Sequence, residues 1–162
     1  MATAIKTTTT RKTSAKAPDA TALLRADHKR VSDLFTEYEK TRSSGRKMAL
    51  VKKICTELSV HAQVEEEIFY PAVKAVLKDK ELVPEAIVEQ STMKALIAQV
   101  EGVTPDGEMF DAKVRVLGEY VKHHVKEEHT EMFPKARRSQ LDMTELGARL
   151  AARKAELIAQ RA

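Results

Sequence analysis

The sequence has little of what interrupts helices or crosslinks a small fold. Its 162 residues include five Gly, five Pro, one Cys and no Trp, whereas Ala, Leu, Glu, Lys and Arg are abundant. This composition favours an all-α protein. The one cysteine, Cys55, cannot form a disulfide within the chain, which is typical of a reducing compartment. We therefore expect a cytoplasmic, all-helical protein in which Cys55 is a buried, inert thiol.

The sequence also lacks any apolar run near the ~20 residues of a membrane-spanning helix, so no membrane partner is expected. Residues 1–18 have no acidic residue and contain Lys6, Arg11, Lys12 and Lys16. Their Thr- and Lys-rich composition predicts a disordered basic tail. The alternative is an organelle-targeting peptide, although the segment has few Arg residues and a poor apolar face.

The net charge of +4 comes from this tail. The other 24 of the 28 basic residues are balanced by 24 acidic residues. A neutral folded part offers no broad cationic surface for phosphates. Residues 19–162 are thus predicted to form one domain that does not bind nucleic acid.

Apolar residues in this domain recur at the spacing of amphipathic helices. Short connections between four long helices imply antiparallel neighbours. The predicted fold is an up-down-up-down four-helix bundle with a short fifth C-terminal helix, and Pro71 and Pro134 are expected to kink or end the second and fourth helices. The apolar stripes run from Leu24 to Tyr38, after a cap at Asp19 or Thr21, from Leu50 to Val76, from Pro84 to Val100 and from Phe110 to Met132, with a fifth helix after Asp142.

Polar residues interrupt each of the four apolar stripes near its middle. Even a neutral polar group that is buried without a partner costs about 1–3 kcal/mol, and a carboxylate costs more. Chance is therefore a poor explanation for six such positions, and they indicate a functional site. They are His28, His61, Glu65, Gln90, His124 and Glu128.

Four of these residues form two copies of a His-x-x-x-Glu motif. Residues four apart lie on the same face of a helix, so His61 and Glu65 point the same way, as do His124 and Glu128. Imidazole and carboxylate donors inside a bundle predict a metal site for iron, manganese or zinc rather than calcium or copper. Two carboxylates on opposite helices can bridge two ions.

The two halves of the chain repeat each other. His28 precedes His61 by 33 residues, and Gln90 precedes His124 by 34 residues. In this alignment Asp27-His28 corresponds to Glu89-Gln90. Gln90 therefore stands where the symmetry of the repeat calls for a histidine.

Three segments, "LRADHKRV", "HAQVEEEIFYP" and "HHVKEEHTEMFPKAR", resemble the hemerythrin-like (HHE cation-binding) family. The resemblance implies that His28, His61 and His124 ligate metal and that Glu65 and Glu128 bridge two irons. It also implies a protein that binds or senses dioxygen or a related small oxidant. This family usually has a histidine in the third helix. With Gln90 there, the second ion is expected to be the weaker one, unless Gln90 ligates through its carbonyl oxygen or Glu89 takes part.

Two other functions fit the same residues. The site could consume peroxide or nitric oxide as a di-iron enzyme, or it could be vestigial in a structural or regulatory bundle. For the binding protein and for the enzyme alike, the expected ligand is a small diatomic molecule or a peroxide. Tyr120 is predicted to be a core aromatic or a group facing the metals, with a weaker case for Tyr38, whereas His123 and His129 are predicted to be surface or flank residues.

Overall fold

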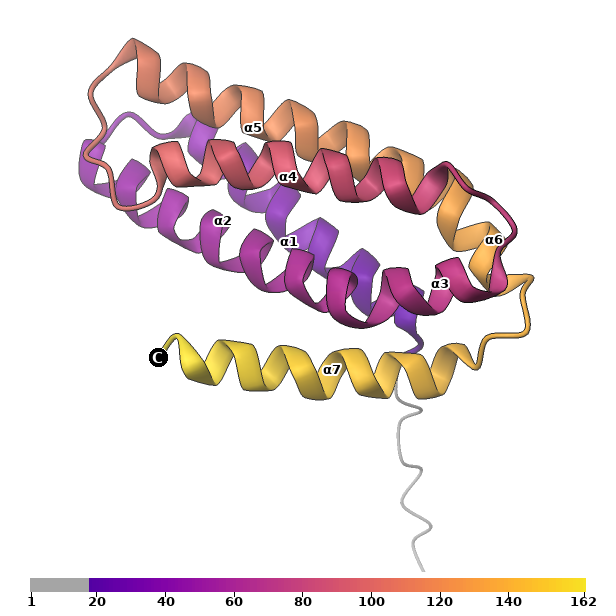
Figure 1. The fold of residues 1–162 in the computed structure, drawn as a ribbon. Coiled ribbons are helices and arrows are strands. Elements are labelled where there is room, and N and C mark those ends of the chain that lie inside the picture. The colour runs from indigo at the N-terminus through magenta and orange to yellow at the C-terminus, as the bar shows by residue number, and fades with distance from the viewer. Residues whose placement is uncertain (1–17) are drawn as a thin grey trace, which may run out of the picture.

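The computed structural model describes residues 18–162, which form helices and no strand. The predicted disordered tail therefore lies, except for Pro18, outside the described residues. Figure 1 shows four long antiparallel helical arms and one further helix at the C-terminus. The elements are α1 (Ala20–Lys40), α2 (Ser44–Val64), η1 (Glu65–Phe69), α3 (Tyr70–Val76), α4 (Leu82–Val100), α5 (Glu108–Glu127), η2 (Glu128–Met132), α6 (Phe133–Arg137) and α7 (Met143–Gln160).

The predicted fold class is confirmed. The first arm of the bundle is α1, and the second is α2 continued by η1 and α3. The third is α4, and the fourth is α5 continued by η2 and α6. The fifth helix, α7, has 18 residues and is close in length to α4, which has 19. None of the helices in residues 18–162 is long and apolar enough to cross a membrane.

Three of the helices begin at a short polar residue whose side chain caps the helix, just before an apolar stripe. Asp19 accepts a hydrogen bond from the amide of Ala22 at 2.9 Å, and Asp142 accepts one from Glu145 at 3.0 Å. Ser43 does the same for α2. These caps satisfy amide groups that have no partner within the helix. Asp19 is one of the two caps predicted for the first helix, and the last helix begins directly after Asp142, as predicted.

Pro71 and Pro134 do not end their helices, contrary to one of the two expectations. Each proline follows a π-helical turn, η1 or η2, and the chain then continues as an α-helix. A proline ring clashes with the carbonyl group four residues earlier in a regular α-helix. A wider π turn accommodates the ring by inserting one residue. Glu65 and Glu128 are the first residues of these two turns.

The apolar core is divided into two clusters. One lies near α3, α6 and α7 and includes Leu24, Phe69 and Phe133; the other lies toward the opposite end and includes Val31, Ile54 and Leu117. The six buried polar residues predicted from the sequence lie between these clusters along the four arms. The core therefore contains a polar layer near its middle.

Candidate metal centre

The structure brings all six predicted site residues together in this layer. None of their side chains is more than slightly exposed, and those of Glu65, Gln90 and Glu128 are almost completely buried. All four arms contribute: α1 carries His28, α2 and η1 carry His61 and Glu65, α4 carries Gln90, and α5 and η2 carry His124 and Glu128.

The half of the centre near His28 has the donors of a nitrogen-rich site. His28 Nε2 lies 3.0 Å from His61 Nε2 and 3.3 Å from Glu128 Oε1. His61 Nε2 lies 2.8 Å from Glu65 Oε1. The donor atoms of His28, His61 and Glu128 lie within 4.8 Å of one another, and so do those of Glu65, His124 and Glu128. Each set of three could meet one ion, and Glu128 belongs to both sets.

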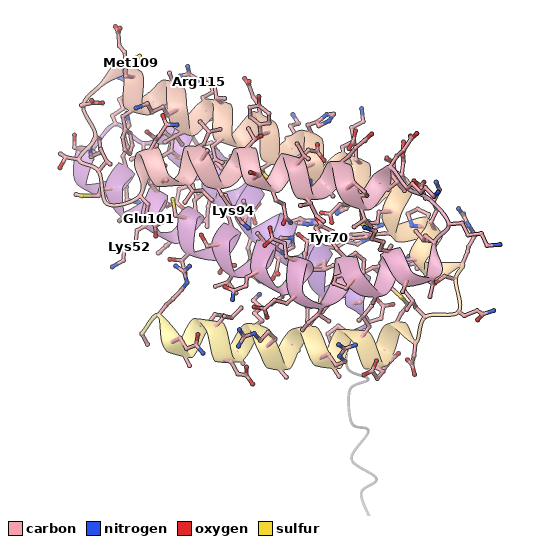
Figure 2. All side chains as sticks on the ribbon, viewed as in Figure 1. Lys52, Tyr70, Lys94, Glu101, Met109 and Arg115 are labelled. Atoms are coloured by element: carbon pink, nitrogen blue, oxygen red, sulfur yellow. The ribbon has the colours of Figure 1, made fainter. Side chains whose placement is uncertain are left out.

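The other half replaces a histidine by an amide and a phenol. His124 Nε2 lies 3.3 Å from Glu128 Oε1 and 3.0 Å from the hydroxyl of Tyr70. Gln90 Nε2 donates to Glu65 Oε1 and to the Tyr70 hydroxyl, both at 3.0 Å. Tyr70 also donates to Glu128 Oε2 at 3.2 Å. In Figure 2, Tyr70 lies in the interior between α3 and α4.

Sequence reasoning missed Tyr70 and favoured Tyr120 instead. Tyr120 is 42% exposed and lies on the outer face of α5, so the predicted role as a core aromatic or a group facing the metals was wrong. Tyr38 is buried but donates to Asp111 at 2.6 Å, away from the centre. Tyr70 lies five residues after Glu65 and directly after the π turn η1, and this position is the signal that could have identified it.

Two carboxylates orient the histidines from behind. His61 Nδ1 lies 2.9 Å from Asp27 Oδ2, and His124 Nδ1 lies 3.2 Å from Glu89 Oε1. Such partners fix the ring orientation and leave Nε2 free to ligate. The repeat predicted from the sequence is thus visible in the structure, since Asp27 and Glu89 occupy equivalent places. Glu89 contacts the side of His124 that faces away from Glu128.

Asp27 also connects the centre to the C-terminal helix. Its Oδ1 forms ion pairs with Arg30 of α1 and with Lys154 of α7. Burial alone would raise the pKa of Asp27, but the hydrogen bond and charge of His61, together with Lys154, hold that pKa at about 2. A buried anion that is paired on both sides keeps His61 in one orientation.

His129 lies at the flank of the centre, one of the two places predicted for it, but closer to the ligands than a regular helix allows. On a regular α-helix it would lie about 140° from His124 and about 100° from Glu128. In the structure it is only half-buried, yet its Nε2 lies 2.7 Å from His28 Nδ1. The π turn that contains His129 changes the angular register of η2 and brings the ring toward α1. His123 is exposed and Cys55 is buried, as predicted, and burial raises the pKa of the Cys55 thiol to about 12.

Three oxygen atoms in the centre lack a hydrogen-bond partner among the described residues. They are Glu65 Oε2, Gln90 Oε1 and Glu128 Oε1, all fully buried. An unsatisfied buried acceptor costs about 1–3 kcal/mol, and a charged one more. The Glu65 and Glu128 carboxylates, from two arms, also have donor atoms within 4.8 Å of His124, and such acceptors fit a cation because each can donate a lone pair to it.

Without a metal ion, protons balance the negative charge of the buried carboxylates in the centre. Burial alone would lower the pKa of His61 and of His124, but the neighbouring carboxylates raise these pKa values to about 10 and about 9. Burial and the charge of Glu65 raise the pKa of Glu128 to about 7. Burial lowers the pKa of His28 to about 4, so this imidazole is neutral and ready to ligate.

A small cavity of about 30 Å³ adjoins the centre. A cavity needs about 10–15 Å³ of such space to hold one water molecule, so this cavity suits a molecule of two or three heavy atoms. One side is formed by the polar residues of the centre. The other side is apolar and is formed by Val31, Leu58, Met93, Ile97 and Val121.

Comparisons with known proteins identify the family and the fold. The model of the hemerythrin HHE cation binding domain family matches residues 19–136. A crystal structure of a hemerythrin HHE cation binding domain-containing protein from Mycobacterium kansasii superposes with a TM-score of 0.76, at 20% identity, over 88% of this chain and 89% of that one. At that identity the likeness shows the fold alone.

A relative from Nostoc sp. named DNA nickase is 32% identical over 111 residues. The match covers 68% of this chain but 31% of that relative. The chain therefore spans about a third of the length of that relative. Most of the longer protein has no counterpart in the match.

Proposed function

The chain belongs to the hemerythrin HHE cation-binding family, and from this premise we propose that its buried centre is a non-haem iron site that binds or senses dioxygen or a related small oxidant. His28 and His61 would hold one ion, and His124 the other, with Glu65 and Glu128 between them. Manganese or zinc can use the same donors. Iron bound there would supply the reversible electron transfer that binding of an oxidant requires.

The observation that carries this proposal is the set of three unpartnered buried oxygens at Glu65, Gln90 and Glu128. One of them, Glu128 Oε1, lies 3.3 Å from both His28 Nε2 and His124 Nε2, so nitrogen and oxygen donors meet there. Gln90 presents either its oxygen or its amide to the centre, since the two ends of the amide differ only in their hydrogen bonds. The Tyr70 hydroxyl adds a further oxygen in the half that lacks the histidine.

The adjoining cavity supports a small oxidant as the ligand. Its volume of about 30 Å³ excludes organic substrates, and its apolar wall favours an uncharged molecule such as a diatomic gas. The four arms and their two apolar clusters keep bulk water away from the centre. Exclusion of water protects a reactive complex from side reactions.

Consumption of peroxide is the second candidate, and Tyr70 favours it. Its hydroxyl lies 3.0 Å from His124 Nε2 and 3.2 Å from Glu128 Oε2, among the donors that would hold the second ion. Peroxide reduction consumes protons, and a buried hydroxyl in contact with Glu128 can hold and pass one at its oxygen atom. Nitric oxide reduction has the same need.

One experiment separates these functions. Full-length protein is loaded with Fe(II) under anaerobic conditions, its iron per chain is measured, and its visible spectrum is recorded during exposure to air and subsequent degassing. Reversible binding gives an absorption change that degassing reverses. Steady consumption of added peroxide or nitric oxide at a rate proportional to bound iron would instead establish an enzyme. A chain that retains no metal after loading would contradict both and would leave the vestigial bundle.

A further inference from the structure

A third His-x-x-x-Glu pair lies one residue out of step with the second. His123 and Glu127 precede His124 and Glu128, so they project from a different face of α5. His123 is exposed, and its Nε2 lies 3.2 Å from Glu127 Oε1. The same nitrogen lies 3.3 Å from Glu89 Oε2 of the neighbouring helix α4.

We propose that Glu89, His123 and Glu127 form a surface site for a divalent transition-metal ion such as Zn²⁺, separate from the buried centre. Two donors that are each about 2.1 Å from one ion at tetrahedral angles lie about 3.4 Å apart. Both separations from His123 Nε2 are close to that value. They are longer than the ~2.7–2.9 Å of a good charge-assisted hydrogen bond.

The chemistry of the three donors selects the class of ion. One ligand atom from each residue lies within 4.8 Å of the other two. One imidazole and two carboxylates suit Zn²⁺, Mn²⁺ or Fe²⁺ and suit Ca²⁺ less, because Ca²⁺ takes six or more oxygen ligands. The carboxylates also supply two negative charges to balance the ion.

The site is open to solvent on one side. The His123 side chain is 62% exposed and that of Glu127 is 37% exposed, whereas Glu89 is 19% exposed. Three protein donors therefore leave room for water to complete the coordination. An ion can exchange at this site without any movement of the bundle.

Glu89 connects this surface site to the buried centre. Its Oε2 faces His123, and its Oε1 lies 3.2 Å from His124 Nδ1. One carboxylate thus serves a surface ion through one oxygen and orients a buried ligand through the other. This connection rests on the proposed function of His124, whereas the surface site itself does not.

The test is a Zn²⁺ titration of the full-length protein as purified, with its buried metal in place and monitored by elemental analysis. We expect one additional Zn²⁺ per chain. Glu127→Gln should weaken this binding at least as much as the ~10-fold that loss of even an outer-shell partner costs. Glu108→Gln removes the same charge from an exposed position at the far end of α5 and is the matched control, with unchanged binding expected.

Two results would overturn the proposal. One is a titration in which no additional Zn²⁺ binds; the other is a Glu127→Gln variant that binds Zn²⁺ as well as Glu108→Gln does. Glu65→Gln keeps the test independent of the buried centre. If Glu65→Gln loses the buried ion, or if no buried ion exists, Zn²⁺ binding that still depends on Glu127 supports the surface site by itself.

Discussion

At the scale of single residues, the two halves of the centre differ in a coordinated way. In one half, His28 packs against Phe133, the first residue after the π turn η2. In the other half, Gln90 contacts Tyr70, the first residue after the π turn η1. Phe133 stacks on His28 with ring centroids 6.0 Å apart, and Tyr70 accepts a hydrogen bond from Gln90. The loss of an imidazole is thus accompanied by the gain of a phenol oxygen.

Tyr70→Phe tests whether this oxygen serves the second ion. We expect bound metal to fall toward one ion per chain, because the second ion would lose the phenol oxygen beside His124 and keep only His124 and the carboxylates. The metal-free protein should lose about 1–3 kcal/mol of unfolding free energy, since the Gln90 amide loses an acceptor. Elemental analysis and chemical denaturation measure both quantities. Tyr120→Phe removes an exposed hydroxyl and should change neither; equal metal content in the two variants would remove Tyr70 from the centre.

Protons and metal ions compete for the same imidazoles. The pKa values of about 10 for His61 and about 9 for His124 lie above the usual histidine value, so both rings carry a proton at pH 7 when no metal is bound. The stability that these protons contribute is complete below about pH 6.5 and is lost as the pH rises through about 9 to 10.

Metal binding must displace these protons. We therefore expect metal affinity to rise between pH 6 and pH 8.5, by about tenfold per pH unit for each proton that an ion releases. Calorimetric titration at pH 7 in buffers of different ionisation enthalpy counts the released protons. A count of zero would mean that the imidazoles are neutral before metal binds.

At the scale of elements, two features position the centre: the π turns and the C-terminal helix. The π turns let the second and fourth arms continue through Pro71 and Pro134, and they turn Tyr70 and His129 toward the interior. Helix α7 covers one side of α1 and α2, as Figure 1 shows. Its Lys154 pairs with Asp27 beside the centre, and its Gly147 packs against the backbone of residues 18–20.

Gly147→Ala should destabilise the protein although alanine is the better helix former. A Cβ atom at this position would lie 2.6 Å from the backbone oxygen of Pro18, so α7 or the start of the chain would have to move. Overpacking of this kind costs about 1–3 kcal/mol. Gly45→Ala is the control, because its Cβ meets only Ser43 Oγ at 3.9 Å, and it should raise stability by up to ~1 kcal/mol.

Thermal or chemical unfolding of both variants measures this difference. A Gly147→Ala protein as stable as Gly45→Ala would mean that α7 does not pack closely on Pro18.

Lys154→Met should weaken metal binding from a distance. It removes a cation from Asp27, which orients His61, and loss of such a partner typically costs about tenfold or more in affinity. Competition with a chelator measures the affinity. Arg149→Met removes an exposed cation from the same helix and should leave it unchanged. Equal affinities in the two variants would show that Arg30 alone suffices to hold Asp27.

At the scale of the whole molecule, the polar layer is a weakness of the bundle that a bound cation would remedy. Three unpartnered oxygens lie between two apolar clusters. Ions that bind the folded protein but not the unfolded chain stabilise the fold, by about 2.7 kcal/mol when the free ion is at 100 times its Kd.

Removal of metal should therefore lower the melting temperature. Chelation of the loaded protein, followed by calorimetry, is the measurement, and readdition of metal should restore the transition. Glu65→Ala should melt at one temperature whether or not chelator is present. A loaded protein that melts where the stripped protein does would indicate that the polar layer holds no ion.

The sequence by itself determined the helices, their order and the residues of the polar layer. Apolar spacing within one helix is a local property, and so is the alignment of residues four apart, such as His61 with Glu65. The repeat of Asp27-His28 in Glu89-Gln90 also predicted equivalent places in the two halves. These patterns need no knowledge of neighbouring helices.

Only the tertiary structure decided which residues complete the centre. A helical wheel assumes 3.6 residues per turn, so it could not place His129 or Tyr70, which lie within or just beyond a π turn. The pairing of Lys154 with Asp27 joins residues 127 positions apart, and nothing in either local segment predicts it. Contacts of this kind depend on how whole helices pack, because a side chain's partners across a bundle are set by the positions of the helix axes and not by its own helix.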